Sequence, residues 1–377
     1  MATESTPSSE PRFFDSRAAY MMFVTTTTEK AAVAARIAAE LPKLQPGPDS
    51  FRVFDAGMGD ASVLINVMRN MHEAFTHVPW LIVGKEISVE DARQALDKLP
   101  DRLHEHPEMV FVVTNMTNLE APHLRPEAGK PQMSWRETVL EGSTTLDFTR
   151  QIRAIHDSIT HDWKVVTSPK SGNPIYENPA VHVIYRKDRE FILRRVLPKP
   201  YSFDGRYDLV IASQPYRARR SAAQKVSTVI RPLARALAPG GRLLAIHGHG
   251  RDPGIEIIRN VWPDENPFET DRHALLAEAA QQLRDESDAD LVMEHLTDEE
   301  ALFRYEMHAM PVEAQEHIGT SSILAAWNAA AYVAQIDEER MSKAVTSGAY
   351  IEATRSVIEE HGGIWFNDES YIISRAR

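Results

Sequence analysis

The stretch that most constrains the fold is a strand, a glycine turn and a helix at residues 51–68. Residues 51–55 are rich in strand formers and end in an acid, Asp55. Gly57 and Gly59 follow, and an apolar run then continues as a helix. Such a unit brings backbone N–H groups and a helix N-terminus to one point. We therefore expect a nucleotide or another polar ligand to lie close to the main chain here.

Two glycines alone do not decide the ligand, because many tight turns contain such a pair. The dinucleotide-binding fingerprint wants a third glycine or an alanine at the position of Ser62, which argues against a nicotinamide cofactor. Whether this turn is a ligand site depends on which residues stand at the ends of the other predicted strands.

Composition excludes several classes of protein. The 377 residues carry a net charge of -12, which argues against general nucleic-acid binding. The chain has no cysteine, so disulfides, thiolate catalysis and thiolate metal sites are excluded. It shows neither a secretory signal nor an apolar run of membrane-spanning length. These features favour a cytoplasmic enzyme.

Further buried strands alternate with helical patterns along the chain, which predicts an α/β, doubly wound and mostly parallel sheet. These strands are expected at residues 81–86, 109–113, 207–212 and 242–246. Ligands of such sheets lie beyond the carboxyl ends of the strands. A polar residue stands at or just after each expected end: Asp55, Glu86, Asn115, Ser213 and His247.

These residues resemble a known family. Asp55-Ala-Gly-Met-Gly59 is similar to the first motif of class I S-adenosylmethionine-dependent methyltransferases. Glu86 matches that family's ribose-binding acid, and Leu237-Ala-Pro-Gly-Gly-Arg-Leu243 matches the turn before its fifth strand. The resemblance implies a seven-stranded Rossmann-like sheet with S-adenosylmethionine as cofactor.

The resemblance also implies cofactor contacts. The loop N–H groups would hold the carboxylate of S-adenosylmethionine, Asp55 its ammonium group and Glu86 its ribose. The cofactor-binding residues it implies are Asp55, Gly57, Gly59, Glu86, Asn115, Met116 and Ser213. Ala61 stands where the family often has a third glycine.

Ser213-Gln-Pro-Tyr216 has the position and partial shape of the family's Asn-Pro-Pro-Tyr motif. Enzymes of the family that carry that motif methylate planar nitrogens. The alternative is a proline-stiffened loop with a packing tyrosine. The candidate substrate contacts are Gln214, Pro215, Tyr216 and Arg217. His247 and Tyr216 are candidate bases, and no spacing around His247 supplies a metal site.

Two regions lie outside this pattern. The insertion 119–202 is expected to contain a helix at 144–159 and a hairpin of 181–185 with 191–196, as a substrate cover or dimer element. The C-terminal region 311–377 is expected to hold helices and a hairpin of 364–366 with 371–374. The expected division of the chain is a disordered tail at 1–12, a cofactor domain at 13–118 and 203–310, the insertion, and the C-terminal region. An antiparallel pair of 290–295 with 301–307 is favoured as the sheet edge.

The predicted function is methyl transfer from S-adenosylmethionine to a small soluble acceptor, with nitrogen as one option for the attacking atom. One alternative is an aminopropyltransferase, although Gln214 stands where that chemistry wants an acid. A nicotinamide-dependent oxidoreductase and a non-catalytic adenosyl-binding protein are others. No membrane partner is expected, and a homodimer is plausible.

Overall fold

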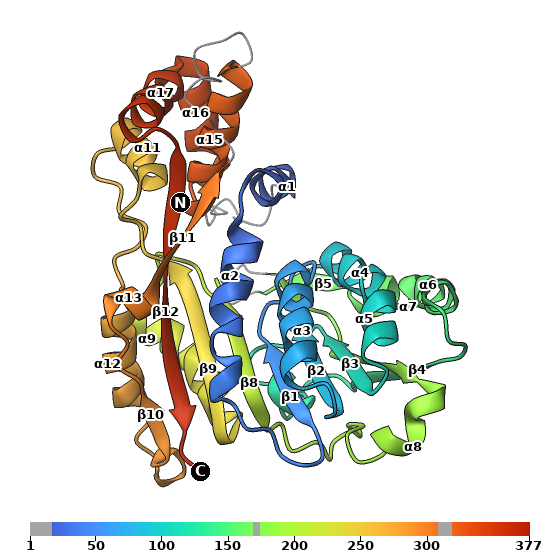
Figure 1. Cartoon of the computed structure of the whole chain (residues 1–377). Helices are drawn as coiled ribbons and strands as arrows, with labels where there is room; N and C mark the ends of the chain where they lie inside the picture. Colours follow the sequence, from blue (N-terminus) through green and yellow to red (C-terminus); the bar gives the residue numbers. More distant parts are fainter. Residues whose placement is uncertain (1–16, 169–173, 308–318) are drawn as a thin grey trace, which may run out of the picture.

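The computed structural model describes residues 17–168, 174–307 and 319–377. The predicted disordered tail, residues 1–12, lies outside the described residues. A large mostly parallel sheet runs through the molecule with helices on both faces (Figure 1). This confirms the doubly wound, Rossmann-like fold, but the sheet has ten strands where seven were predicted.

The parallel centre of the sheet is the part that the sequence predicts best. Its strands lie in the order β3-β2-β1-β8-β9. They are β1 (Phe51–Asp55), β2 (Trp80–Lys85), β3 (Met109–Thr114), β8 (Tyr207–Ser213) and β9 (Leu237–Gly248). Because they are parallel neighbours, their carboxyl ends lie along one edge of the sheet.

The antiparallel edge differs from the prediction. One long strand, β12 (Ile364–Arg375), pairs with β9, and no turn interrupts it, so the predicted C-terminal hairpin is wrong. The segments expected to pair with each other, β10 (Leu291–Met293) and β11 (Leu302–Met307), each pair with β12 instead. The polar run 367–370 resembles a turn in sequence, but it is buried between β9 and β11 and remains extended.

The insertion extends the main sheet. Its strand β7 (Ala180–Arg186) pairs antiparallel with β3, and β4 (Ser134–Leu140) pairs parallel with β7. The predicted hairpin after β7 is wrong, because a short helix, α8 (Glu190–Leu193), follows there. The expected helix at 144–159 is two helices, α6 (Thr145–Ala154) and α7 (His156–Asp162). Strands β5 (Val165–Thr167) and β6 (Pro174–Tyr176) form a separate pair.

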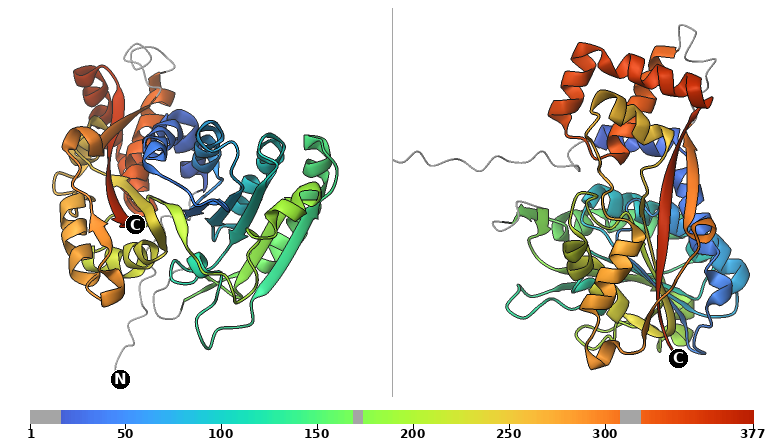
Figure 2. Two further views of the ribbon diagram at one scale, coloured as in Figure 1. Left: turned by 60° about the horizontal axis from the view of Figure 1, so that its bottom comes forward. Right: turned by 90° about the vertical axis from the view of Figure 1, so that its left-hand side faces the viewer.

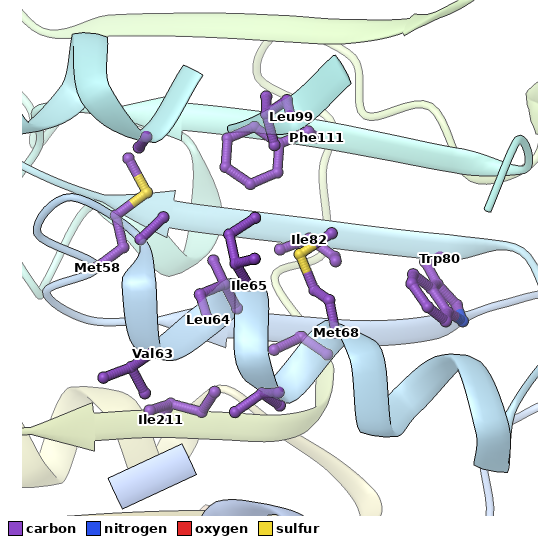
Figure 3. Close-up of a cluster of buried hydrophobic side chains, with 14 of the residues drawn as sticks. Met58, Val63, Leu64, Ile65, Met68, Trp80, Ile82, Leu99, Phe111 and Ile211 are labelled. Carbon is purple, nitrogen blue, oxygen red and sulfur yellow. The ribbon is translucent and has the colours of Figure 1, made fainter. Parts of the chain in front are cut away.

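Helices cover the two faces of the sheet. One face packs against α2 (Glu29–Ala38), α3 (Ser62–Ala74), α4 (Val89–Asp97) and α5 (Leu99–Glu105). The other packs against α9 (Ala222–Lys225), α10 (Arg231–Arg235) and α12 (Arg272–Gln282). Figure 3 shows Leu64 and Met68 of α3 against the sheet residues Ile82 and Ile211. Apolar side chains at this helical spacing fix α3, and with it the glycine turn that precedes it.

A third core lies beyond the sheet. We call its helices the helical cap: α1 (Arg17–Thr26), α11 (Pro253–Val261), α15 (Gly319–Val333), α16 (Glu338–Ser347) and α17 (Ala349–His361). They pack against one end of β11 and β12, and α13 (Asp298–Ala301) precedes β11 (Figures 1 and 2). Trp327 is fully buried in this core. None of the helices in the described ranges is long and apolar enough to cross a membrane.

Candidate cofactor site

The glycine loop after β1 is tied to both neighbouring strands. Ala56 N–H donates to the carbonyl of Ile211 in β8, at 2.9 Å, and Met58 N–H donates to the carbonyl of Lys85 in β2, at 3.0 Å. The Asp55 carboxylate accepts the N–H of Gly57 at 3.1 Å. These bonds hold the loop over the carboxyl ends of three adjacent strands.

Glu86 meets the loop from the end of β2. Its carboxylate accepts the N–H of Gly59 at 2.9 Å, and its other oxygen accepts the N–H groups of Ile87 and Ser88 at 2.8 and 2.7 Å. Two residues predicted to bind one cofactor, Gly59 and Glu86, are therefore in direct contact. Gly59 also has a φ of +51°, in the left-handed region that favours glycine.

The two acids of this site differ in exposure, since Asp55 is buried and Glu86 is half-buried. Asp55 is 3% exposed, and burial raises the pKa of its carboxyl to about 7. Burial also raises the pKa of Glu86 and lowers the pKa of the neighbouring Lys85. A buried carboxyl such as Asp55 at a ligand-binding edge favours a cationic ligand, because an opposite charge stabilises the ionised carboxylate where water does not reach it.

Gly57 has space around it that the fold does not use. Its φ lies outside the left-handed region, and an added Cβ would meet no atom within 4 Å. Gly84 of β2 differs, because a Cβ there would overlap Met58. Gly84 is thus required by packing, whereas the open side of Gly57 leaves room for a ligand against the main chain.

Tyr20 of α1 and Lys30 of α2 lie over the loop, and sequence reasoning missed both. An added Cβ at Gly59 would be 3.6 Å from the Tyr20 hydroxyl. Lys30 Nζ lies 5.5 Å from the centre of the Tyr20 ring and 3.3 Å from Glu29. Burial works to lower the pKa of Lys30, but Glu29 and the other nearby acidic groups together outweigh it and raise that pKa. Burial also raises the pKa of Tyr20 to about 12, so both side chains keep their protons at neutral pH.

Asn115 and Met116 are engaged elsewhere. The Asn115 amide donates to the carbonyls of Asp162 and Asn178, at 3.1 and 3.0 Å, and accepts the N–H of Ala180 at 2.8 Å. Met116 is fully buried in the apolar core of the second face. In this structure the two side chains hold the insertion and fill the core.

The loop after β8 reaches toward β12. Ser213, Pro215 and Arg217 are half-buried, and Gln214 has a φ of +48°. The Gln214 amide donates to Asp368 of β12, with both carboxylate oxygens at 3.3 Å.

Asp368 is fully buried. Burial, with the nearby carboxylates of Glu29 and Asp252, raises the pKa of its carboxyl well above its usual range. Asp368 of strand β12 thus lies against the side chain of Gln214. No local pattern in the sequence indicates this contact, because the run around Asp368 resembles a turn.

Tyr216 and His247 are brought together, but on the packed face of the sheet. Tyr216 is 9% exposed, and its hydroxyl lies 3.0 Å from the hydroxyl of Tyr371. Its ring lies 5.8 Å from the His247 ring and 5.1 Å from Lys225 Nζ. In this conformation packed side chains surround both candidate bases.

His247 belongs to a buried ion cluster. Its Nε2 lies 2.9 Å from Oε1 of Glu369, and Nη1 of Arg272 lies 3.2 Å from Oε2 of the same carboxylate. Burial works to raise the pKa of Glu369, but His247 and His249 together outweigh it and hold that pKa well below its usual range. Glu369 is the central residue of this cluster and was not predicted from the sequence.

Comparisons with known proteins find similarity among solved structures but not among sequences. At the level of sequence, no protein family and no curated protein matches this chain. Among solved structures, it is similar to a loganic acid methyltransferase with SAH, at 8% identity and a TM-score of 0.40, over 96% of this chain and 95% of that one.

Coclaurine N-methyltransferase, bound to N-methylheliamine and SAH, matches at 8% identity and a TM-score of 0.37, over 97% of this chain and 77% of that one. A protein from Galdieria sulphuraria, described as a sarcosine dimethylglycine methyltransferase, matches at 10% identity and a TM-score of 0.35. The match covers 92% of this chain and 85% of that one. All three neighbours are named as methyltransferases, and two of them are bound to SAH. With TM-scores below 0.5, they do not decide what this chain does.

Proposed function

We propose that this protein is an S-adenosylmethionine-dependent methyltransferase acting on a small acceptor. The observation that carries the proposal is the contact of the glycine loop with Glu86, beside the buried acid Asp55 and the open side of Gly57. A strand-end acid next to such a loop suits a ribose, and a buried acid suits an ammonium group. These residues therefore fit an adenosyl cofactor that carries an amino-acid tail.

The cofactor, when bound, supplies an activated methyl group, and the chain supplies position. Asp55 would pair with the ammonium group, while Lys30 would attract the carboxylate. Glu86 would exchange its bond from Gly59 for bonds from the ribose hydroxyls. Tyr20 would cover the tail and exclude water from it.

We further propose that the acceptor is an amine. Asp368 and Glu29 are both buried, and Glu29 lies close enough to help raise the Asp368 pKa. Asp368 also contacts the loop after β8 through the Gln214 amide. A protonated amine between them would stabilise both carboxylates. This agrees with the nitrogen acceptor suggested by Ser213-Gln-Pro-Tyr216.

Asp368 also favours a second candidate, an aminopropyltransferase. That chemistry wants an acid where Gln214 stands, and the structure places Asp368 against the Gln214 side chain. The donor in aminopropyl transfer is decarboxylated S-adenosylmethionine, which has no carboxylate. Lys30 would therefore contact the donor of a methyltransferase but not that of an aminopropyltransferase.

Calorimetry with the full-length protein tests the proposal. We expect S-adenosylhomocysteine to bind at micromolar protein, and a nicotinamide dinucleotide to give no heat. The reverse result would sink the proposal. Turnover with S-adenosylmethionine, compared with its decarboxylated form, then separates methyl from aminopropyl transfer.

A further inference from the structure

A cavity of about 290 Å³ lies in the insertion, outside the cofactor site. Its lining includes Gln132, Ser134, Arg136, His161, Asp162 and Asn178. Strand β7 begins beside the carboxyl end of β3, with Val181 opposite Thr114, and β4 begins beside β7. The cavity therefore opens near the edge of the sheet that carries the cofactor loops.

Asp162 organises this cavity. It ends α7, and its side chain is 5% exposed. One carboxylate oxygen lies 2.5 Å from Arg136 Nε, 2.8 Å from His182 Nε2 and 3.2 Å from the Ser134 hydroxyl. The other accepts Arg136 Nη2 at 3.1 Å. Burial works to raise the pKa of Asp162, but Arg136 and His182 together outweigh it and lower that pKa.

The histidine behind Asp162 is neutral. His182 is 1% exposed, and burial lowers the pKa of its ring. Its Nδ1 is buried without a hydrogen-bond partner in the described part of the chain, so the proton lies on Nε2, toward Asp162. The charge of Asp162 is thus balanced by Arg136 alone.

Arg136 is held in a fixed position with unused donor capacity. The two bonds to Asp162 engage Nε and Nη2 and set the plane of the guanidinium, while 44% of the side chain stays exposed. Within the described ranges, its Nη1 has no partner. The exposed amides of Gln132 and Asn178 and the ring of His161 add further donors to the same lining.

We propose that this cavity binds a small oxyanion, a carboxylate or a phosphate, on Arg136. A guanidinium that is already fixed by a buried acid loses little conformational entropy when it binds an anion. Its coplanar N–H donors can also bind two oxygens of one carboxylate or phosphate. Asp162, which is the one acid among the described residues of the lining, already receives bonds from three side chains, so it adds little repulsion. The volume admits a ligand of several heavy atoms rather than one water, whose share of the liquid is about 30 Å³.

Two residues link this cavity to the ends of β2 and β3. Trp163, which follows Asp162, donates its indole N–H to the carbonyl of Glu86 at 2.7 Å. Asn115 holds the backbone of Asp162 and Asn178 from the end of β3. The oxyanion site itself does not depend on which cofactor Glu86 binds.

Titration calorimetry of the full-length protein without cofactor tests the inference, using sodium succinate and inorganic phosphate at matched ionic strength. We expect saturable binding of at least one of them. The anion that binds identifies the group, carboxylate or phosphate. Arg136→Gln should weaken that binding by about tenfold or more, since it removes a charge-assisted bond.

Two further variants keep the test decisive. Asn178→Asp places a negative charge in the cavity without touching the Asp162 cluster, so it should weaken binding even if Arg136→Gln does not fold. Arg150→Gln, an exposed arginine of α6, makes the same charge change outside the cavity and should have no effect. The inference is overturned if neither anion saturates below about 10 mM, or if Arg150→Gln weakens binding as much as Arg136→Gln.

Discussion

The backbone N–H of Gly59 donates to the carboxylate of Glu86 across 2.9 Å, joining the loop after β1 to the end of β2. The two residues lie far apart in sequence, and the parallel pairing of β1 with β2 brings them together. Their contact defines the point at which a ribose would be held.

Glu86→Gln should weaken the binding of S-adenosylhomocysteine by about tenfold, because an amide accepts fewer and weaker hydrogen bonds than a carboxylate. Calorimetry of the purified variant measures this. Glu73→Gln, an exposed acid of α3, is the matched control. Equal affinities for Glu86→Gln and the unchanged protein would remove Glu86 from the site.

Gly57→Leu should abolish cofactor binding and leave the melting temperature nearly unchanged, because the added side chain enters open space. Gly84→Ala should do the opposite and lower stability by about 1–3 kcal/mol, because its Cβ meets Met58 in a packed core. Thermal melts and calorimetry on both variants test the pair. A Gly57→Leu protein that still binds the cofactor would show that the open side of Gly57 is not the ligand site.

Cofactor affinity should depend on pH through Asp55, whose folded pKa is about 7. Pairing with an ammonium group needs the ionised carboxylate, so affinity should fall as pH drops below 7, by up to about tenfold per unit. Calorimetry between pH 5.5 and 8 measures this slope, and Asp55→Asn should flatten it. Glu86, whose pKa is also raised, contributes in the same direction.

The raised pKa of Asp55 affects the stability of the fold in the opposite direction: stability should fall, rather than rise, as pH increases. A carboxyl whose pKa is raised by folding binds its proton more tightly in the folded state, so its contribution is lost as pH rises from about 4 to 7. At pH 8, Asp55→Asn should therefore melt at a higher temperature than the unchanged protein. A lower melting temperature would mean that Asp55 is stabilised by a partner in its charged form.

Lys30→Met should weaken binding of S-adenosylmethionine more than binding of its decarboxylated form, because only the first carries a carboxylate for Lys30. Competition calorimetry with both compounds measures the ratio. Lys164→Met, an exposed lysine in the insertion, controls for net charge. An equal loss for both compounds would place Lys30 away from the carboxylate.

Glu369→Gln should lower the free energy of unfolding by about 3 kcal/mol, because it removes the carboxylate beside buried His247 and leaves Arg272 paired with Asp298 alone among the described residues. The lowered pKa of Glu369 stabilises the fold above about pH 4.5, and this contribution is lost as pH falls further. Urea denaturation at pH 7 and pH 4 measures both effects, with the exposed Glu359→Gln as control. A variant of unchanged stability whose turnover loses its pH dependence would instead support His247 as a base.

Local pattern predicts the centre of this fold well. The strands 51–55, 81–86, 109–113 and 207–212 were recognised because each is a short apolar run that ends in a polar residue or a glycine. A buried parallel strand needs apolar side chains on both faces, and this requirement is visible in any window of six residues. The positions of Asp55, Gly57, Gly59 and Glu86 at strand ends follow from the same windows.

The edges of the sheet were decided by pairings between distant segments. Residues 367–370 look like a turn in isolation, yet β12 runs straight through them because β9 and β11 flank it on both sides. That pairing delivers Asp368 to Gln214 and Glu369 to His247. In the same way, β7 joins β3 and so places Arg136 and Asp162 around one cavity.

The sequence by itself determined a parallel α/β core with a glycine loop and an acid at adjacent strand ends, because hydrophobic period and turn chemistry are local properties. Only the tertiary structure decided which buried acids meet Gln214 and His247, and where the insertion places its arginine. Contacts between segments so far apart depend on strand order and on the burial of whole faces, which no single stretch of sequence encodes.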